Sequence, residues 1–254
     1  MLLEGRRALV TGAGGVLGRA SALRFAREGA GVAVLDVDAG AAEETASLVR
    51  AAGGHAFAVT ADVRDQAQVV AAVAAAVTGL GGLDLLFNNA GVMPHQDISF
   101  LDADPALWTT IHDINLLGTV LCSKHAVPHL LDAGGGAVVN MSSFLAVLGC
   151  SVPQDAYAAS KGAVAALTTS MAVQLGPGGV RVNALAPGPV LTAHVEAFFP
   201  DPQSRRERLA RFPLGRFGQP ADVAALACFL ASDDASWLTG QTVVLDGGAS
   251  STYL

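Results

Sequence analysis

The stretch "ALVTGAGGVLGRASALRFAREGA", residues 8–30, joins an apolar run, a glycine-rich turn and an amphipathic segment. The run predicts a buried strand, and the segment after the turn predicts a helix, because its apolar residues recur at helical spacing. Glycines let a backbone turn tightly and approach a ligand closely. The start of the following helix offers free N–H groups and a positive potential, which suit a phosphate. Glycine also serves ordinary turns, so the position between a first strand and a helix is what favours a phosphate-binding turn.

Apolar runs alternate with longer helical patterns along the rest of the chain. Most runs are continuous in Val, Leu and Ala, as strands are when both faces of their sheet are covered. This alternation implies right-handed crossovers and a parallel sheet, and hence an α/β fold. Because no linker or short repeat interrupts it, we expect a single domain over residues 1–254. The predicted strands are 7–12, 31–36, 55–63, 83–91, 136–143, 180–188 and 240–248.

The composition narrows the class of protein. A chain of 254 residues with 52 % hydrophobic and 15 % charged residues can bury a large core. A net charge of −7 without a basic run disfavours non-specific nucleic-acid binding. The first ten residues lack the order of a signal peptide, and the apolar stretch 69–87 contains Asp84, so it predicts a helix, a turn and a strand instead of a membrane span. The cysteines lack metal-ligand spacing and are interpreted as reduced core thiols of a cytoplasmic protein: Cys122, Cys150 and Cys228.

Residues 192–219 break the alternation, because they mix aromatic residues, prolines and arginines. Long excursions in α/β folds often carry part of a binding site. We therefore interpret this segment as a mobile lid over a substrate. A plain surface excursion is the alternative.

Asp36 ends the second predicted strand, eighteen residues after Gly18. An acid near this offset accepts hydrogen bonds from the ribose hydroxyls of an adenosine. It would repel a 2′-phosphate by up to about 4 kcal/mol at 4 Å and an effective dielectric near 20. The next residues, Val37 and Asp38, supply no cation. Asp36 therefore favours NAD over NADP, unless it only starts the next helix.

Tyr157 and Lys161 lie four residues apart in the alanine-rich stretch "QDAYAASKGAV", residues 154–164. Residues at this spacing share one face of a helix. A nearby ammonium favours the phenolate, so we expect Lys161 to lower the Tyr157 pKa from its usual value of about 10. Such a tyrosine suits general-base catalysis. Taken alone, the pair also fits a surface tyrosine stacked on a lysine stem.

Several motifs, in order and at suitable separations, resemble the short-chain dehydrogenase/reductase family over nearly the whole chain. The resemblance implies a doubly wound, Rossmann-like sheet of seven parallel strands with helices on both faces. It also implies a homotetramer or homodimer. The motifs are "TGAGGVLG" (11–18), "NNAG" (88–91), the asparagine of "INLLG" (Asn115), "MSS" (141–143), "YAASK" (157–161), "PG" (187–188) and "LTGQTVVLDGG" (238–248).

One position departs from the family pattern, whose turn reads Thr-Gly-x-x-x-Gly-x-Gly. Gly12 and Gly18 match, but Val16 stands in place of the middle glycine. A β-branched residue is unfavourable at positive φ, so we expect Val16 in helical geometry and the unusual turn conformation at Gly14 or Gly15. The Val16 side chain is then expected to narrow the space for the pyrophosphate.

The resemblance also assigns contacts to the cofactor. Asp62 and Val63 are expected to hold the adenine, and Val190 and Thr192 the nicotinamide carboxamide. The "NNAG" and "PG" segments fall at carboxyl ends of strands, where ligands bind in such sheets. The expected NAD contacts are Gly12, Val16, Leu17, Gly18, Asp36, Val37, Asp62, Val63, Asn89, Ala90, Gly91, Tyr157, Lys161, Pro187, Gly188, Val190 and Thr192.

The same resemblance implies the catalytic roles. Tyr157 is the expected general base or acid, and Ser143 is expected to steady the substrate oxygen. Ser143 precedes Tyr157 by fourteen residues, one more than is usual in the family, so Ser142 is the alternative; its expected role is structural. Asn115 resembles the helix asparagine that anchors a water beside Lys161 and completes a proton path.

The substrate side carries weaker signals. His95, in the loop after "NNAGVMP", is a candidate substrate contact with Met93, and an exposed loop histidine is the alternative. Phe198, with His194 and Phe199 in the proposed lid, favours a partly hydrophobic alcohol or ketone. Three histidines lie on a helix expected at a subunit interface and lack a further ligand, so we predict no metal site: His112, His125 and His129.

These expectations combine into an NAD-dependent oxidoreductase that interconverts a secondary alcohol and a ketone. One alternative is a carbonyl reductase using a reduced cofactor, because "PLGRFGQPADVA" (213–224) resembles 3-oxoacyl-carrier-protein reductases. The other is a non-catalytic dinucleotide-binding regulator, which the intact tyrosine, lysine and serine disfavour. The partner expected is a small molecule, with no nucleic acid and no membrane.

Overall fold

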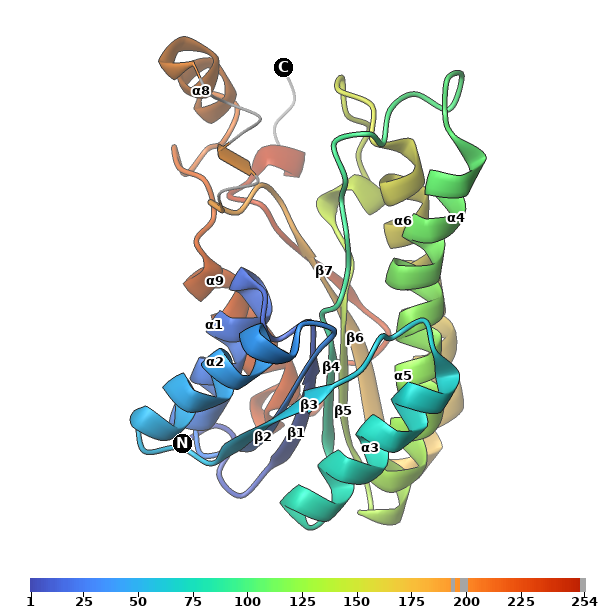
Figure 1. The fold of residues 1–254 in the computed structure, drawn as a ribbon. Helices are drawn as coiled ribbons and strands as arrows, with labels where there is room; N and C mark the ends of the chain where they lie inside the picture. The colour runs from blue at the N-terminus through green and yellow to red at the C-terminus, as the bar shows by residue number, and fades with distance from the viewer. Residues whose placement is uncertain (193–194, 197–200, 252–254) are drawn as a thin grey trace.

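The computed structural model describes residues 1–192, 195–196 and 201–251. Within that part of the chain, seven parallel strands form one sheet (Figure 1). Each lies inside a predicted strand, so the predicted parallel sheet is confirmed. The strands are β1 (Arg7–Thr11), β2 (Gly31–Asp36), β3 (Ala56–Thr60), β4 (Leu85–Asn88), β5 (Gly136–Met141), β6 (Val180–Pro187) and β7 (Thr242–Leu245).

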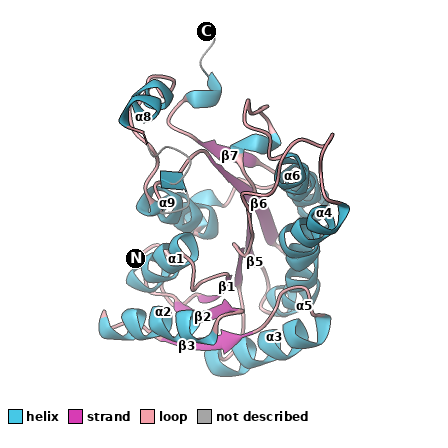
Figure 2. Ribbon diagram, turned by 45° about the horizontal axis from the view of Figure 1, so that its top comes forward, coloured by secondary structure: helices cyan, strands magenta, loops and turns pink. Residues whose placement is uncertain are grey.

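Helices cover both faces of the sheet, as Figure 2 shows. One layer contains α1 (Val16–Arg27), α2 (Ala39–Ala51) and α9 (Pro220–Ala231). The other contains α3 (Gln66–Leu80), α5 (Gly118–Asp132) and α6 (Asp155–Leu175), with α4 (Pro105–His112) beside α6. A π-helical turn, Asp113–Leu117, joins α4 to α5, and α8 (Pro202–Leu209) lies within the excursion after β6.

Alternate residues of the strands supply two separate cores. In β1, Ala8 and Val10 pack with the layer of α1, α2 and α9, whereas Leu9 packs with the layer of α3 and α5. Both sets are fully buried. This two-sided burial explains why the strands are continuous apolar runs with no polar alternation.

The order of the strands determines where a ligand can bind. They run β3-β2-β1-β4-β5-β6-β7, so the winding direction reverses between β1 and β4. In open parallel sheets the crevice beyond this switch point is the usual ligand site. The glycine turn after β1 and the "NNAG" turn after β4 both open into it.

The apolar stretch 69–87 has the predicted form. It contains most of α3, a turn at Gly81 and Gly82 with positive φ, and the start of β4. No helix among the residues that the structure describes is long and apolar enough to cross a membrane.

Candidate active site

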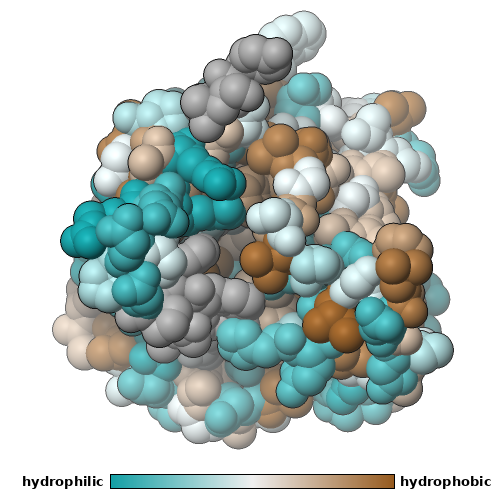
Figure 3. Space-filling model, turned by 90° about the horizontal axis from the view of Figure 1, so that it is seen from above, coloured by the Kyte–Doolittle hydropathy of each residue, from teal (hydrophilic) through white to brown (hydrophobic). Residues whose placement is uncertain are grey.

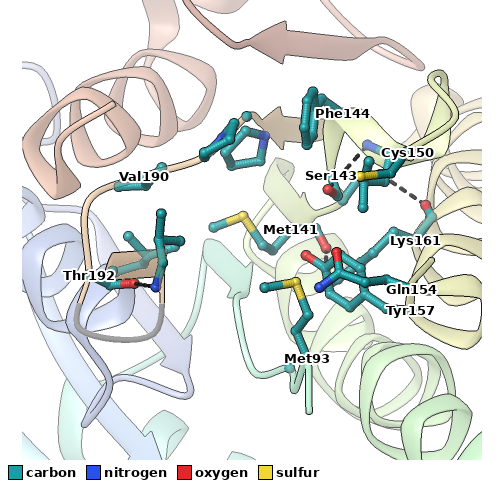
Figure 4. A pocket seen from close by; sticks show the side chains of 18 of the residues that line it. Met93, Met141, Ser143, Phe144, Cys150, Gln154, Tyr157, Lys161, Val190 and Thr192 are labelled. Atoms are coloured by element: carbon teal, nitrogen blue, oxygen red, sulfur yellow. Dashed lines mark hydrogen bonds between the residues drawn. The ribbon is translucent and has the colours of Figure 1, made fainter. Parts of the chain in front are cut away.

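Two adjoining cavities lie at the carboxyl ends of the strands. One, of about 360 Å³, extends from the glycine turn past the ends of β2 and β3; we call it the turn-side cavity. The other, of about 310 Å³, lies between α6 and the loop after β6; we call it the α6-side cavity (Figure 4). Leu17, Asn89, Gly91 and Val92 line both, so the two form one continuous crevice.

The glycine turn is built differently from the prediction. The positive φ, 62°, is at Gly12, and neither Gly14 nor Gly15 has one. A Cβ at Gly12 would lie 2.7 Å from the Ala90 Cα, so the close approach of the "NNAG" turn, as well as the bend, requires glycine. Val16 has the predicted helical geometry as the first residue of α1, and its side chain is 53 % exposed beside the cavity.

Thr11 and Asn89 hold the two turns together. The Thr11 hydroxyl accepts hydrogen bonds from the backbone N–H groups of Asn89 and Ala90, both at 3.0 Å. The Asn89 side chain donates back to the carbonyl oxygens of Thr11, at 2.9 Å, and Gly12, at 3.0 Å. Sequence reasoning assigned Asn89 to the cofactor. In the structure its side-chain amide holds the turn after β1 against the turn after β4, and so helps to shape the crevice.

Asp36 faces the turn-side cavity from the end of β2. Its two carboxylate oxygens accept hydrogen bonds from the backbone N–H groups of Gly14, at 2.9 Å, and Asp38, at 3.0 Å. Arg64 also lines this cavity, but its guanidinium pairs with the Asp62 carboxylate at 2.6 Å. That hydrogen bond lowers the pKa of Asp62. Sequence reasoning missed Arg64 as a cation at this cavity. Its charge is already balanced by Asp62, a residue predicted to contact the adenine.

The structure brings the predicted NAD contacts to the crevice. The turn-side cavity is lined by Gly12, Val16, Leu17, Gly18, Asp36, Val37, Asp62, Val63, Asn89, Ala90 and Gly91. The α6-side cavity is lined by Tyr157, Lys161, Pro187, Gly188, Val190 and Thr192. Their roles toward a cofactor stay predictions.

Tyr157 and Ser143 meet in the α6-side cavity. Figure 4 shows Tyr157 arriving from α6 and Ser143 from the segment after β5. Burial raises the pKa of Tyr157, and a hydrogen bond from the Ser143 side chain opposes that rise. The expected lowering is therefore absent from this structure, because desolvation of the phenolate outweighs the stabilising contacts. Ser142 has the predicted structural role, since its buried hydroxyl donates to the Lys161 carbonyl oxygen at 2.9 Å.

Lys161 is only 3 % exposed. Its ammonium donates to the carbonyl oxygen of Met141 at 2.7 Å and lies 5.7 Å from the centre of the Tyr157 ring. Burial lowers its pKa to about 8, because the charged form loses hydration. The lysine thus contacts the ring of Tyr157 and the end of β5.

Asn115 lies behind the cavity in the π-helical turn and is completely buried. Its amide oxygen accepts from the Val92 N–H at 2.8 Å, and its NH₂ group donates to the Val92 carbonyl and the Ser160 hydroxyl, both at 3.0 Å. A Cβ on Gly91 would lie 3.1 Å from the Asn115 oxygen and 3.2 Å from the Lys161 ammonium. Asn115 therefore joins the end of β4 to α6, and its water-binding role stays a prediction.

Asp97 is a site residue that sequence reasoning missed. Gln154, the residue before α6, makes no side-chain cap. The Asp97 carboxylate, 5 % exposed, instead accepts hydrogen bonds from the backbone N–H groups of Ala156, at 3.1 Å, and Tyr157, at 2.8 Å. It therefore caps the helix from a loop some sixty residues away and fixes the backbone of Tyr157. A lone aspartate in a loop carries no sequence signal for this role.

On the substrate side, the structure agrees with the alternative of an exposed loop histidine for His95, and any substrate contact stays a prediction. Met93 lines the α6-side cavity, whereas His95 is exposed and is not among the lining residues. The chain turns between Pro94 and Asp97, because the Asp97 N–H donates a hydrogen bond to the Pro94 carbonyl oxygen. Beyond this turn the buried side chain is that of Asp97. Cys150 also lines the cavity and is half-buried, so the interpretation of all three cysteines as core thiols is wrong for this one.

The excursion after β6 supplies part of the cavity wall. Val190 and Gly218 form a parallel bridge, so its two ends are joined at the base. Thr192, Val195 and Arg208 line the cavity. Phe198, His194 and Phe199 lie outside the described residues. Movement of the excursion as a lid stays a prediction.

Replacing Asp97 with Asn is expected to destabilise the protein by about 1–3 kcal/mol, because a buried acceptor of two N–H groups loses its charge. It is also expected to lower kcat while the Kd of the cofactor stays unchanged, since the Tyr157 backbone loses its anchor. Urea unfolding, turnover and cofactor titration measure the three quantities. Asp102→Asn, at an exposed position of the same loop, is the control. Loss of stability with full kcat would show that the cap does not position Tyr157.

Replacing Lys161 with Met is expected to stabilise the cofactor-free protein at pH 7 by up to about 3 kcal/mol, because a charged lysine with a pKa near 8 when folded and near 10.4 when unfolded opposes folding. The unfolded chain binds the proton more tightly, so this penalty is complete below pH 8 and fades as the pH rises toward 10.5. Urea unfolding at pH 7 and pH 9.5 should show the gain falling to roughly half.

Lys124→Met is the control for that measurement, because Lys124 is exposed on α5. It is expected to show no pH-dependent gain. A Lys161→Met protein whose stability difference from the parent is the same at both pH values would contradict the lowered lysine pKa.

Comparison with known proteins agrees with this geometry. A family model described as enoyl-(acyl carrier protein) reductase matches residues 12–250. A protein named "Probable short-chain type dehydrogenase/reductase" from Bradyrhizobium diazoefficiens is 43 % identical over 96 % of this chain and 87 % of its own length. The cis-4-hydroxycyclohexanecarboxylate dehydrogenase of Sinomonas cyclohexanicum is 41 % identical over 96 % of each chain.

Two further similarities bear on the type of reaction. The 3-oxoacyl-[acyl-carrier-protein] reductase of Thermotoga maritima is 38 % identical over 98 % of this chain and 99 % of its own. A solved 7α-hydroxysteroid dehydrogenase, complexed with NADH and 7-oxo glycochenodeoxycholic acid, is 34 % identical, with a TM-score of 0.91 over 97 % of this chain and 94 % of that one. Because the family model and these relatives cover nearly the whole chain, the protein belongs to the short-chain dehydrogenase/reductase family of oxidoreductases.

Proposed function

We propose that this oxidoreductase transfers a hydride between a secondary alcohol and NAD, with Tyr157 as the general base. The observation that carries the proposal is the meeting of Tyr157, Ser143 and Lys161 in a cavity continuous with the turn-side cavity. A phenol, a hydroxyl donor and a buried ammonium at one point suit proton transfer to and from a carbinol oxygen.

Three residues of the protein have separate roles in the proposed reaction. Ser143 holds the substrate oxygen, and Tyr157 takes its proton in oxidation or returns it in reduction. Lys161, whose pKa of about 8 leaves it mostly charged at neutral pH, stabilises the phenolate as the proton moves. A bound oxidised dinucleotide would supply the hydride acceptor, and the positive charge that its nicotinamide carries before the transfer would favour the phenolate.

The turn-side cavity suits a dinucleotide. Gly15 precedes α1 without a side-chain cap, and no acidic residue occupies the first turn of that helix. The backbone N–H groups at the start of α1 are therefore available to an anion, and the helix dipole favours an anion at that end of the helix. Val16, the first residue of α1, lines the cavity at this end of the helix, and its side chain has no polar group that could cap the N–H groups.

Asp36 supports NAD as the cofactor over NADP. Two backbone N–H groups hold its carboxylate at the cavity, where it can accept ribose hydroxyls. Arg64 is paired with Asp62 and so does not offset the repulsion of a 2′-phosphate. The solved relative named above is complexed with NADH.

We also propose that the protein works as a cytoplasmic homotetramer or homodimer with residues 192–219 as a lid. Exposed apolar side chains along the outer sides of α5 and α6, among them Val120 and Val173, support an interface between subunits.

Replacing Tyr157 with Phe is expected to lower kcat by about 10²–10⁴-fold or more, because the proton acceptor is removed and the ring is kept. The Kd for NAD is expected to change little, since the hydroxyl is not needed to hold the dinucleotide. NADH absorbance over a panel of secondary alcohols and ketones, and calorimetric NAD titration, measure both. Full activity in Tyr157→Phe would rule out the assigned base. A parent protein that binds NAD but turns over no compound would favour the regulator.

Replacing Asp36 with Ser is expected to shift the ratio of kcat/KM for NAD to kcat/KM for NADP toward NADP by at least about ten-fold, because a repulsive charge is lost. Asp38→Asn is the control, since it removes a neighbouring charge and keeps an acceptor for the cap of α2. A parent protein that binds NADPH tightly and NADH weakly would favour the 3-oxoacyl-type reductase instead, an activity that a relative carries in its name.

A further inference from the structure

The α6-side cavity has an unusual balance of charge. Its described lining includes two cationic side chains, Lys161 and Arg208, and no aspartate or glutamate. The whole protein has a net charge of −7, so acidic residues are the more abundant ones elsewhere. Cationic side chains in the lining of a cavity favour an anionic ligand.

The two cations come from different walls. Lys161 comes from α6 and is engaged with the Met141 carbonyl beside Tyr157. Arg208 comes from α8 and lines the same cavity; Figure 1 shows α8 and α6 on opposite sides of the upper end of the molecule. Figure 3 views this end of the molecule and shows hydrophobic residues near the centre, with a hydrophilic group to the left where α8 lies. The side chains between the two walls are mainly apolar: Met93, Met141, Leu145, Val152, Val190 and Val195.

Arg208 is suited to a carboxylate. A guanidinium presents parallel N–H donors that match the two oxygens of a carboxylate. The Arg208 guanidinium carbon lies 5.9 Å from the centre of the Phe212 ring, and this contact restricts its orientation. A carboxylate fits this wall better than a phosphate monoester, because the second charge of the phosphate would meet apolar side chains.

We infer that the substrate is an anionic secondary alcohol or the corresponding ketone, a hydroxy or oxo acid whose carboxylate binds Arg208 across an apolar spacer from the carbon that faces Tyr157. This inference rests on the proposed function, since Tyr157 marks the reacting end. It makes Arg208 a determinant of specificity, one that recognises the far end of the substrate and takes no part in proton transfer.

Arg206 provides a matched control on the same helix. It is exposed, bonds to the Gln203 side chain at 2.9 Å and does not line the cavity. Arg206→Gln and Arg208→Gln change the net charge equally, so any difference between them reports the position of Arg208 and not the long-range field of the protein.

The kinetic test compares hydroxy acids with their neutral primary amides, including 4-hydroxycyclohexanecarboxylate and its carboxamide. The parent enzyme is expected to prefer the acid in kcat/KM, and Arg208→Gln to reduce that preference by roughly 10- to 100-fold, mainly through KM. Arg206→Gln is expected to keep the preference. A parent that prefers the amides, or equal losses in both variants, would overturn the inference.

A binding test separates this inference from the proposed reaction. Cyclohexanecarboxylate has no hydroxyl to oxidise, and its binding to the protein in the presence of NAD is measured by calorimetry. Weaker binding to Arg208→Gln than to Arg206→Gln supports the carboxylate site even if no alcohol is turned over, in which case only the reaction is wrong. Equal binding to both variants overturns the site even if alcohols are oxidised.

Discussion

The hydrogen bonds between Thr11 and the turn that begins at Asn89 are the contacts on which the crevice depends. They join the ends of β1 and β4, the two strands between which the direction of winding reverses. They extend the direct pairing of these two strands into the turns that follow them. With them, the start of α1 and the Gly91 backbone that packs against Lys161 form one continuous wall. The restriction to glycine at residue 12 follows from this closeness, because the Ala90 backbone occupies the space of a side chain.

The second half of the crevice depends on how α6 is held. Its first turn is capped by Asp97, its lysine bonds to the end of β5, and Ser160 bonds to Asn115 of the π-helical turn. These contacts come from three different parts of the chain. They keep a phenol and an ammonium fixed where water is largely excluded, so each group has a pKa displaced toward its neutral form. In the proposed reaction, the unfavourable free energy of burying them would be the physical basis of their reactivity.

The sequence is sufficient to predict the strands and most of the crevice, for identifiable reasons. Continuous apolar runs have one stable environment, the middle of a two-faced sheet, and the motif residues lie at the strand ends that such a sheet brings together. What sequence reasoning missed depends on contacts between distant segments. The positive φ is at Gly12, because a turn after β4 packs there, and the cap by Asp97 joins a loop to a remote helix. Met93 and not His95 faces the cavity because of a turn at Pro94. The Tyr157 pKa is raised because the phenol is desolvated, and the spacing of residues along the sequence does not reveal desolvation.

The bridge between Val190 and Gly218 has a consequence for how such a protein can diversify. It closes the excursion at its stem, so the residues between these two positions form a cassette whose entry and exit points are fixed side by side. Exchanging the cassette would alter the wall that carries Arg208 without moving the strand ends or α6. Selection for a new compound can therefore act on the 27 residues from 191 to 217 while Tyr157, Ser143 and Lys161 stay unchanged, because loops on a rigid scaffold tolerate replacement.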